Sequence, residues 1–298
     1  MSLSVWLRVI RVRFLLASVI AVSVGLSLNW WETSSFDLIN AIFVMGGVVA
    51  LHASIDLLND YWDFKRGIDT RTKRTKFSGG TGVLPEGLLN PFSVYKAGMI
   101  FLIIGSVIGV YLVLVNGLVI AVLLTFAIVS IYFYSTKIVD SGLAEVFVTI
   151  KGIVIVLGTY YIQAGLLTTS SLLAGVSVGV LSSFVLFITS FPDYDADKSR
   201  GRKTLIIVLG RKLSTNIYWI FPIINYCIIV LGIMTQNFPN LSIITFATIP
   251  ILIHAGKELK SGYNNLEKLT TIMKSTLLFS RLTGTLLVLS FLFANLVT

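Results

Sequence analysis

The stretch Asp56-Leu-Leu-Asn-Asp-Tyr-Trp-Asp63-Phe-Lys-Arg-Gly-Ile-Asp69 ends a long apolar run and fills that end with carboxylates. A second acidic stretch, Asp193-Tyr-Asp-Ala-Asp197, also follows an apolar run, and basic residues and a glycine follow it from Lys198 to Lys203. Carboxylates are the side chains that hold Mg²⁺ beside the phosphates of a substrate. Two acidic patches backed by Lys and Arg therefore predict a site for divalent cations and for an anion that they neutralise.

The rest of the chain is too apolar for a soluble domain of this size. Of its 298 residues, 55% are hydrophobic and 12% are charged, and the mean hydropathy is +0.90. A helix needs about 20 apolar residues to cross a bilayer. The sequence offers runs at 14–31, 36–59, 92–115, 117–135, 143–165, 171–191, 215–234, 240–255 and 276–297, of which 240–255 is the shortest.

These runs are continuous, whereas the strands of a membrane β-barrel alternate apolar and polar residues over about ten positions. No soluble domain or long linker interrupts them. We therefore predict an all-α fold, a polytopic membrane bundle of nine transmembrane helices around a central cavity. Residues 1–298 are expected to form one domain.

The basic residues are distributed as in a membrane protein. The formal charge is +9, from 23 Lys and Arg against 14 Asp and Glu. If nine helices are threaded from the N-terminus, all basic residues fall on one side or at helix ends that face it, and the opposite loops carry only Glu32 and Asp37. The positive-inside rule then predicts a cell-membrane protein whose N-terminus, acidic patches and cavity opening are cytoplasmic. This distribution favours a bilayer over nucleic acid as the partner of the positive charge.

Polar side chains recur at helical spacing along residues 52–63, in and just before the first acidic patch. They are His52, Asp56, Asn59, Asp60 and Asp63. At this spacing they are expected to share one helix face. A charge inside a membrane costs at least ~2.5 kcal/mol and faces the bundle interior or a water-filled cavity. Carboxylates on one face repel each other unless cations bind between them, which favours a metal site. The alternative is that Asp60 and Asp63 lie in the interface and pair with Lys65 and Arg66; His52 is given no role.

Other charged residues are expected near the same site. Asp193 and Asp197 face the same way if a helical turn continues past Pro192. Lys137 lies on the cytoplasmic side of the fourth run, where it is expected to reach a diphosphate. Glu145 and Lys151 lie inside the fifth predicted helix, and their burial in lipid would be too costly, so they are expected to pair or to line the cavity.

These parts together indicate a chemistry. Two carboxylate sites that flank one diphosphate through Mg²⁺ would stabilise it as a leaving group. A substrate that joins such a headgroup to a tail soluble in the bilayer is a polyprenyl diphosphate. Its ionisation yields an allylic carbocation, which aromatic faces stabilise while water is excluded. An acceptor nucleophile then captures the cation.

The two acidic motifs resemble those of the UbiA superfamily of intramembrane prenyltransferases, which have nine helices and the motifs N-D-x-x-D and D-x-x-x-D. Asn59-Asp60-Tyr-Trp-Asp63 and Asp193-Tyr-Asp-Ala-Asp197 match them. The chain is most similar to the menaquinone branch, which attaches a polyprenyl chain to 1,4-dihydroxy-2-naphthoate with loss of the carboxylate. The similar stretches are 59–70, 80–87, 142–145, 157–165, 201–205 and 209–210.

The resemblance implies a role for individual residues. The residues implied to hold Mg²⁺ and diphosphate, and thus to be catalytic, are Asn59, Asp60, Asp63, Asp193 and Asp197. The residues implied to bind substrate are Lys137, Arg202 and Lys203 at the diphosphate, with Asp56, Asp69 and Tyr134. Asp69 matches an acidic position of the menaquinone-branch motif. Asp56 stands where that branch carries Asn, and Thr189-Ser190 replace polar residues before the second motif, so both departures concern the acceptor pocket.

Two other functions fit part of the pattern. One is ether-lipid synthesis with a geranylgeranylglyceryl phosphate acceptor, but that group carries a P-x-R-P-like stretch after the first motif, and this sequence has none. The other is a secondary transporter that uses the carboxylates for ion coupling. Transporter sites lie near the bilayer midplane, whereas both acidic patches are expected at one face.

Overall fold

The computed structural model describes residues 3–69 and 74–297, and within these ranges the protein is helical with no strand. Nine spans in this part of the chain are long and apolar enough to cross a membrane. The helices that form them are α2 (Val12–Thr33), α3 (Leu38–Lys65), α4 (Pro91–Asn116), α5 (Leu118–Phe133), α6 (Ala144–Ala164), α7 (Thr169–Thr189), α10 with α11 (Arg211–Ile217 and Ile220–Met234), η3 with α12 (Asn240–Thr248 and Ile249–Gly262) and α13 (Leu266–Val297). The predicted nine-helix membrane bundle is confirmed.

Three short helices lie outside these spans: α1 (Leu3–Val9), α8 (Tyr194–Ser199) and α9 (Leu205–Leu209). Two spans are irregular. A π-helical segment (Tyr134–Ile138) and a 3₁₀ turn (Val139–Ser141) follow α5, and the eighth span begins as the 3₁₀ helix η3. The eighth span also has the lowest mean hydropathy of the nine, 1.2.

Helices α3, α12 and α13 all extend well beyond the predicted apolar runs, and α12 continues to Gly262, past the predicted end at residue 255. Helix α3 continues to Lys65, past the predicted end at residue 59, so the whole of Asn59–Asp63 is helical. Helix α13 begins at Leu266, whereas the apolar run begins at residue 276. Its added turns carry the exposed charges Glu267, Lys268 and Lys274. Apolar length predicts the part of a helix that lies in lipid, and a helix continues outside the bilayer where it can expose such charges.

Close backbone contacts join the helices around the cavity. Helix α3 packs mainly against α4, and α6 against α7. At the second contact, a Cβ added to Gly152 would lie 2.5 Å from the Cα of Gly179. Small residues allow membrane helices to approach in this way, because lipid supplies no hydrophobic force between them. The two glycines therefore hold α6 and α7 at a spacing that larger residues would prevent.

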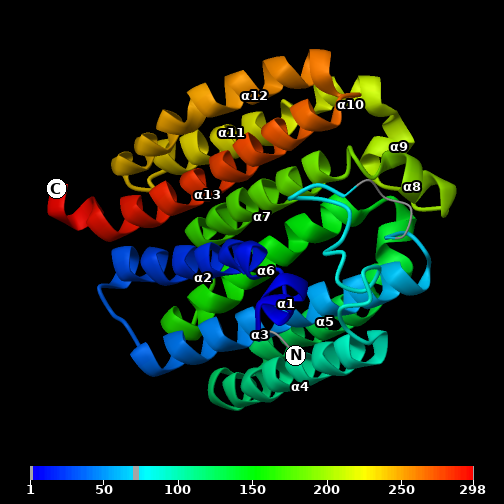
Figure 1. Ribbon diagram of the computed structural model, residues 1–298. Coiled ribbons are helices and arrows are strands. Elements are labelled where there is room, and N and C mark those ends of the chain that lie inside the picture. Colours follow the sequence, from blue (N-terminus) through cyan, green and yellow to red (C-terminus); the bar gives the residue numbers. More distant parts are fainter. Residues whose placement is uncertain (1–2, 70–73, 298) are drawn as a thin grey trace.

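One end of the bundle collects the connections that carry the acidic motifs. Figure 1 shows the loop between α3 and α4, in cyan, at the same end as α8 and α9. The short α1 packs there as well, with Val9 in a buried cluster with Leu57 of α3 and Val83, Leu84 and Leu89 of the loop. The loop is thus anchored by an apolar core of its own and lies next to both acidic motifs.

Candidate active site

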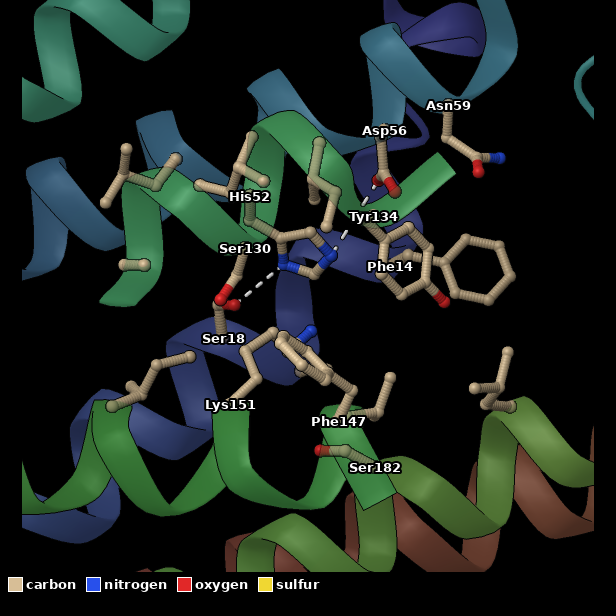
Figure 2. A pocket seen from close by; sticks show the side chains of 18 of the residues that line it. Phe14, Ser18, His52, Asp56, Asn59, Ser130, Tyr134, Phe147, Lys151 and Ser182 are labelled. Carbon is tan, nitrogen blue, oxygen red and sulfur yellow. Dashed lines mark hydrogen bonds and ion pairs between the residues drawn. The ribbon is translucent and has the colours of Figure 1, made fainter. Parts of the chain in front are cut away.

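A cavity of about 390 Å³ runs from the acidic motifs into the interior of the bundle. Helices α2 to α7 and α13 line it. Near its acidic end lie Asn59, Asp63, Asp193, Asp197 and Arg202, and deeper positions are largely apolar, with a polar group of Ser18, His52, Asp56 and Lys151 among aromatic rings (Figure 2). The cavity thus joins a charged end to a long apolar interior.

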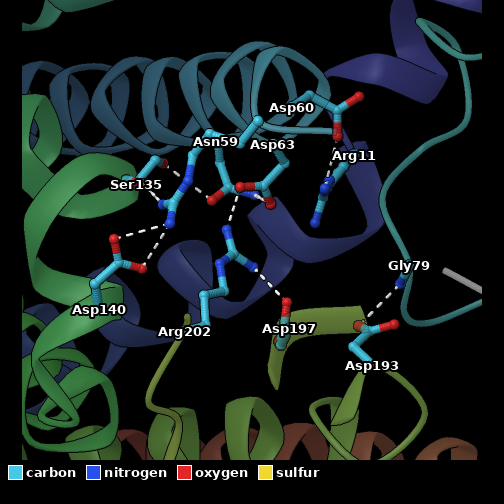
Figure 3. Close-up of polar contacts among 11 residues, drawn as sticks. Arg11, Asn59, Asp60, Asp63, Gly79, Ser135, Asp140, Asp193, Asp197 and Arg202 are labelled. Atoms are coloured by element: carbon cyan, nitrogen blue, oxygen red, sulfur yellow. Dashed lines mark hydrogen bonds and ion pairs between the residues drawn. The ribbon is translucent and has the colours of Figure 1, made fainter. Parts of the chain in front are cut away.

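Arg202 connects the two acidic motifs. It is the donor to Asp63 on α3 through Nη2 and to Asp197 on α8 through Nη1, the latter at 3.1 Å. All three side chains are at least nine-tenths buried, and Figure 3 shows the guanidinium between the two carboxylates. Two motifs that are 130 residues or more apart in the chain therefore converge on one cation.

The local fold places Arg202 beside Asp197. The backbone carbonyl of Asp197 accepts hydrogen bonds from the N–H groups of Arg200 and Arg202, both at 3.1 Å. Gly201 lies between them with φ +76°, a conformation that glycine adopts without steric cost. The N–H of Asp197 donates to the carbonyl of Asp193 at 2.9 Å, so a helical turn does continue past Pro192, which was the condition for Asp193 and Asp197 to face the same way.

Asp60 faces away from the other motif residues. It is fully buried and accepts hydrogen bonds from Arg11 Nη2 at 2.7 Å and from the Thr81 hydroxyl, but it does not line the cavity. Each residue of an α-helix turns the direction of the side chain by about 100°. The shared face that the spacing predicts therefore holds His52, Asp56, Asn59 and Asp63, while Asp60 lies at its edge.

The glycine-rich loop contacts both motifs. Its Gly79 N–H donates to Asp193 Oδ2 at 3.2 Å, and its Thr81 N–H donates to Asp60 Oδ1 at 3.3 Å. Gly80, with φ +71°, lies against Asp69, because an added Cβ would come within 2.6 Å of that carboxylate. The loop therefore covers the acidic end with backbone N–H groups that point toward carboxylates.

A second arginine fixes the π-helical segment after α5. Arg66, at the end of α3, donates to both carboxylate oxygens of Asp140, at 3.0 and 2.9 Å, and to the carbonyl of Ser135. The Ser135 hydroxyl donates to Asn59 Oδ1 at 3.0 Å. These contacts hold the segment that carries Tyr134 against α3, and Tyr134 lines the cavity.

The other predicted site residues differ in whether they line the cavity. Asp56, Asp69, Thr189 and Ser190 line the cavity. Lys137 and Lys203 are exposed and do not line it, and the ammonium of Lys137 lies over the Phe133 ring at 5.0 Å. Glu145 is buried and accepts from the N–H of Leu205, so it does not pair with Lys151.

Burial controls the protonation of the acidic end. Burial, and then the neighbouring Asp197, raise the pKa of Asp193 well above its usual value. Burial, followed by the carboxylates of Asp63 and Asp60, raises the pKa of Asp69 to about 8. Burial also raises the pKa of Asp197, although Arg202 acts in the opposite direction. Of these carboxyls, Asp69 therefore keeps its proton at neutral pH unless a cation is supplied.

The donor set fits a hard, oxygen-bound cation such as Mg²⁺. Buried Oδ1 of Asp193 and Oδ2 of Asp69 have no hydrogen-bond partner among the described residues. Within residues 3–69 and 74–297, however, no three acidic, His or Cys side chains lie close enough together to hold an ion. The guanidinium of Arg202 lies between Asp63 and Asp197 and occupies the position between these two carboxylates.

Sequence reasoning missed two residues of this end, Arg11 and Thr81. Arg11 lies between α1 and α2 in the left-handed conformation, with φ 53°, and its guanidinium is directed at Asp60. Its signal in the sequence was weak, because it belongs to a run of arginines before the first apolar segment, and such a run is typical of any cytoplasmic helix end. Thr81 lies among Gly79, Gly80 and Gly82, and a glycine-rich loop is by itself only a weak signal of an anion site.

The fold and the site together define a helical membrane protein with paired acidic motifs at one end of an apolar cavity. The sequence profile of the UbiA prenyltransferase family matches residues 18–279. The chain belongs to this family and is a prenyltransferase, as its resemblance implied.

Two curated relatives illustrate the similarity. The chain is 24% identical over 262 residues to UbiA prenyltransferase domain-containing protein 1 of Xenopus tropicalis, covering 85% of this chain and 73% of that protein. It is 27% identical over 215 residues to the 1,4-dihydroxy-2-naphthoate octaprenyltransferase of Escherichia coli, covering 69% and 68%.

Two solved structures share the fold. A UbiA homolog from Aeropyrum pernix matches with a TM-score of 0.71 and 17% identity, over 93% of this chain and 98% of that one. A UbiA homolog from Archaeoglobus fulgidus, bound to DMAPP and Mg²⁺, matches with a TM-score of 0.65 and 14% identity, over 95% and 98%.

Proposed function

We propose that this protein transfers a polyprenyl group from a polyprenyl diphosphate to an aromatic acceptor similar to 1,4-dihydroxy-2-naphthoate, in a Mg²⁺-dependent reaction of quinone synthesis. The observation that carries the proposal is the convergence of both acidic motifs on Arg202 at the mouth of an apolar cavity. The relatives named as naphthoate prenyltransferases favour an aromatic acceptor over a glyceryl phosphate lipid. Membership in a prenyltransferase family leaves no support for a transporter.

In this proposal the acidic end holds the diphosphate. Asn59, Asp63, Asp193 and Asp197 would hold Mg²⁺, which supplies charge neutralisation at the leaving group. Asp60 would act indirectly and not as a Mg²⁺ ligand, because it positions Arg11 and Thr81. Arg202 would exchange one of its carboxylates for a diphosphate oxygen, to which a guanidinium donates strong, charge-assisted hydrogen bonds. Lys137 and Lys203 remain predicted diphosphate ligands.

The chain's own residues would then guide the transfer. The C–O bond of the prenyl diphosphate breaks, and its electron pair leaves with the diphosphate. The allylic carbon bonds to the ring carbon that carries the carboxylate, and the ring regains aromaticity as that carboxylate departs as CO₂. The Tyr134 ring borders the cavity near Asn59 and would stabilise the allylic cation, while the apolar walls exclude water.

We also propose that residues 1–298 act as one domain in the cell membrane, with the N-terminus and the acidic end in the cytoplasm. The support is the distribution of charge, because the basic residues gather on one side of the predicted membrane. This orientation is tested with single cysteines introduced at Lys198 and at Asp37. Each is treated with a cysteine-reactive reagent that cannot cross the membrane. Labelling of intact cells only at residue 37 supports it, and labelling only at residue 198 contradicts it.

The reaction itself is tested by diphosphate release from the purified protein. Wild-type protein is expected to release diphosphate from a prenyl diphosphate only with Mg²⁺ and 1,4-dihydroxy-2-naphthoate both present. Asp63→Asn and Asp193→Asn are expected to lower the rate by roughly 100-fold or more, because each removes a charge that neutralises the leaving group. Asp195→Asn is the matched control, since Asp195 belongs to the same motif but pairs with Arg211 at the surface. Full activity in the first two variants would contradict the proposal.

A further inference from the structure

A second polar cluster lies deeper in the same cavity, on the membrane side of the acidic end. It consists of Ser18 on α2, His52 and Asp56 on α3, and Lys151 on α6, and all four line the cavity. Figure 2 shows Lys151 extending from one wall, beside Phe147, and His52 and Asp56 on the opposite wall. The resemblance implied a substrate role for Asp56 but none for Ser18, His52 or Lys151.

Lys151 is the unusual member of this cluster. It lies inside a membrane span, where a charged side chain costs at least ~2.5 kcal/mol and marks a functional site unless it is paired. Its ammonium forms no hydrogen bond and no ion pair within 4.0 Å with any residue of 3–69 or 74–297. The structure therefore holds a cation in the cavity wall without a counterion in contact.

The opposite wall presents a hydrogen-bond acceptor. His52 Nδ1 and Ser18 Oγ are 2.7 Å apart, which fixes the imidazole ring. The other ring nitrogen, Nε2, lies 3.8 Å from Asp56 Oδ2, too far for a hydrogen bond. Asp56 Oδ2 has no hydrogen-bond partner among the described residues. Asp56 thus lines the cavity, and one of its carboxylate oxygens makes no hydrogen bond among the described residues.

The space between these groups has aromatic and hydroxyl walls. Phe14 and Phe147 border it, and the Phe147 ring stacks on Phe126 with centroids 5.5 Å apart. The hydroxyls of Ser130 and Ser182 also line the cavity, and both donate to backbone carbonyls of their own helices, which leaves their oxygens as acceptors. Flat rings and acceptor oxygens suit a planar, hydroxylated aromatic ligand, whereas a prenyl tail needs no polar partner.

We propose that this cluster binds the acceptor as a hydroxylated aromatic carboxylate, with Lys151 paired to the carboxylate and Asp56 accepting a hydrogen bond from the ring hydroxyl. The inference rests on the proposed function, because it names the acceptor subsite of that reaction. It goes further in giving the anionic group of the acceptor a fixed partner. Lys151 and Asp56 lie on opposite walls, so a ligand that carries both an anion and an O–H donor satisfies both at once.

A matched pair of stable aromatic probes tests the ammonium–carboxylate contact. The probes are 1-hydroxy-2-naphthoate and 1-naphthol, which share the ring and the hydroxyl and differ by the carboxylate. Binding of each is measured by calorimetry with wild-type protein, Lys151→Met, Lys151→Arg and the control Lys274→Met, which removes an exposed lysine of α13. Hydrogen bonds to charged groups are strong enough that wild type is expected to bind the naphthoate about tenfold or more tighter than the naphthol.

The expected results separate the variants. In Lys151→Met the ratio of naphthoate affinity to naphthol affinity is expected to fall to about one. Affinity for the naphthoate drops, while affinity for the naphthol is unchanged. Lys151→Arg keeps most of the preference, and Lys274→Met keeps all of it. An unchanged preference for the naphthoate in Lys151→Met would overturn the proposal. An equal loss of affinity for both probes would also overturn it, because it would indicate a general effect on the cavity.

A second measurement separates this inference from the proposed function. Mg²⁺-dependent binding of geranyl thiodiphosphate, an unreactive analogue, is measured for the same four proteins. The analogue is expected to bind all four with the same affinity, because it occupies the acidic end. If no protein binds the analogue, the proposed function fails, while the ratio of the two naphthalene probes still decides whether Lys151 binds a carboxylate.

Discussion

The two ends of the cavity differ in whether their charged side chains form ion pairs. At the acidic end, Asp60 pairs with Arg11, while Asp63 and Asp197 share Arg202. At the deep end, Lys151 and Asp56 lie on opposite walls, and neither forms an ion pair with a lysine, arginine or carboxylate of the described residues. The acidic end can therefore stay folded without a ligand, because its charges neutralise each other. The deep end keeps its charges available, and this difference divides the cavity into a leaving-group site and an acceptor site.

The largest expected effect concerns the arginine that neutralises the acidic end. Arg202→Met leaves Asp63 and Asp197 buried without a cation, and removal of one partner from a buried ion pair costs about 3–5 kcal/mol. We expect the midpoint of thermal unfolding in detergent to fall by several degrees and diphosphate release to be lost.

Arg211→Met is the control for this prediction, since its partner Asp195 has a side chain 79% exposed. A surface ion pair contributes about 0–1 kcal/mol, so this variant should unfold near the wild-type temperature. Equal stability of both variants would show that Arg202 does not neutralise the acidic end.

A smaller effect is expected from the loop that covers the acidic end. Gly80→Ala places a methyl group 2.5 Å from the Asp69 carboxylate and also strains a backbone with φ +71°. Gly87→Ala, at φ +68°, introduces the same backbone strain with no atom within 4 Å. Each variant should lose about 1 kcal/mol of stability from backbone strain.

Only Gly80→Ala should also weaken the Mg²⁺-dependent binding of geranyl thiodiphosphate, by roughly tenfold, because it displaces a carboxylate of the site. The measurement is the dissociation constant of the analogue for both variants. Similar affinities for the two would indicate that Asp69 lies outside the diphosphate site.

The smallest expected effect is the influence of pH on cation binding. Burial raises the pKa of Asp69 to about 8, so a cation that binds beside this carboxyl at the acidic end is expected to displace its proton. The affinity for Mg²⁺ should be highest above pH 8 and should fall on the order of tenfold between pH 8.5 and 6.5. Titration with Mn²⁺, followed by electron paramagnetic resonance, measures this.

Asp69→Asn should flatten the pH dependence, because it removes the carboxyl that gives up a proton. An affinity that does not change with pH in the wild type would mean that the cation binds carboxylates that are already ionised.

The fold could be predicted well from the sequence because long apolar runs are a strong signal of membrane-spanning helices. Apolar length alone identifies nine spans, and the largest differences between their predicted and observed ends are at α3, α12 and α13, which continue past the apolar runs. The convergence of Asp63 with Asp197 also followed from the helical spacing of each motif, given that both end at the same face.

Other features of the site depended on contacts that spacing does not contain. Arg11 reaches Asp60 only because the chain turns sharply between α1 and α2, and a run of arginines gives no sign of such a turn. Asp60 itself was expected on the shared face, but a difference of one residue from Asn59 rotates it toward the loop. Lys151 was correctly expected to line the cavity or to pair, and which of these it does depended on how α3 and α6 face each other.

The central claim is that the acidic end binds a prenyl diphosphate through divalent cations held by both motifs. A crystal structure of the protein with Mn²⁺ and geranyl thiodiphosphate tests it most directly, because anomalous scattering locates Mn²⁺ without reference to the protein. The account predicts Mn²⁺ within coordination distance of Asp63 and of Asp193 or Asp197, with the diphosphate between the motifs and Arg202 moved onto it. Mn²⁺ bound to one motif alone, or a diphosphate seated beside Lys151 at the deep end, would contradict it.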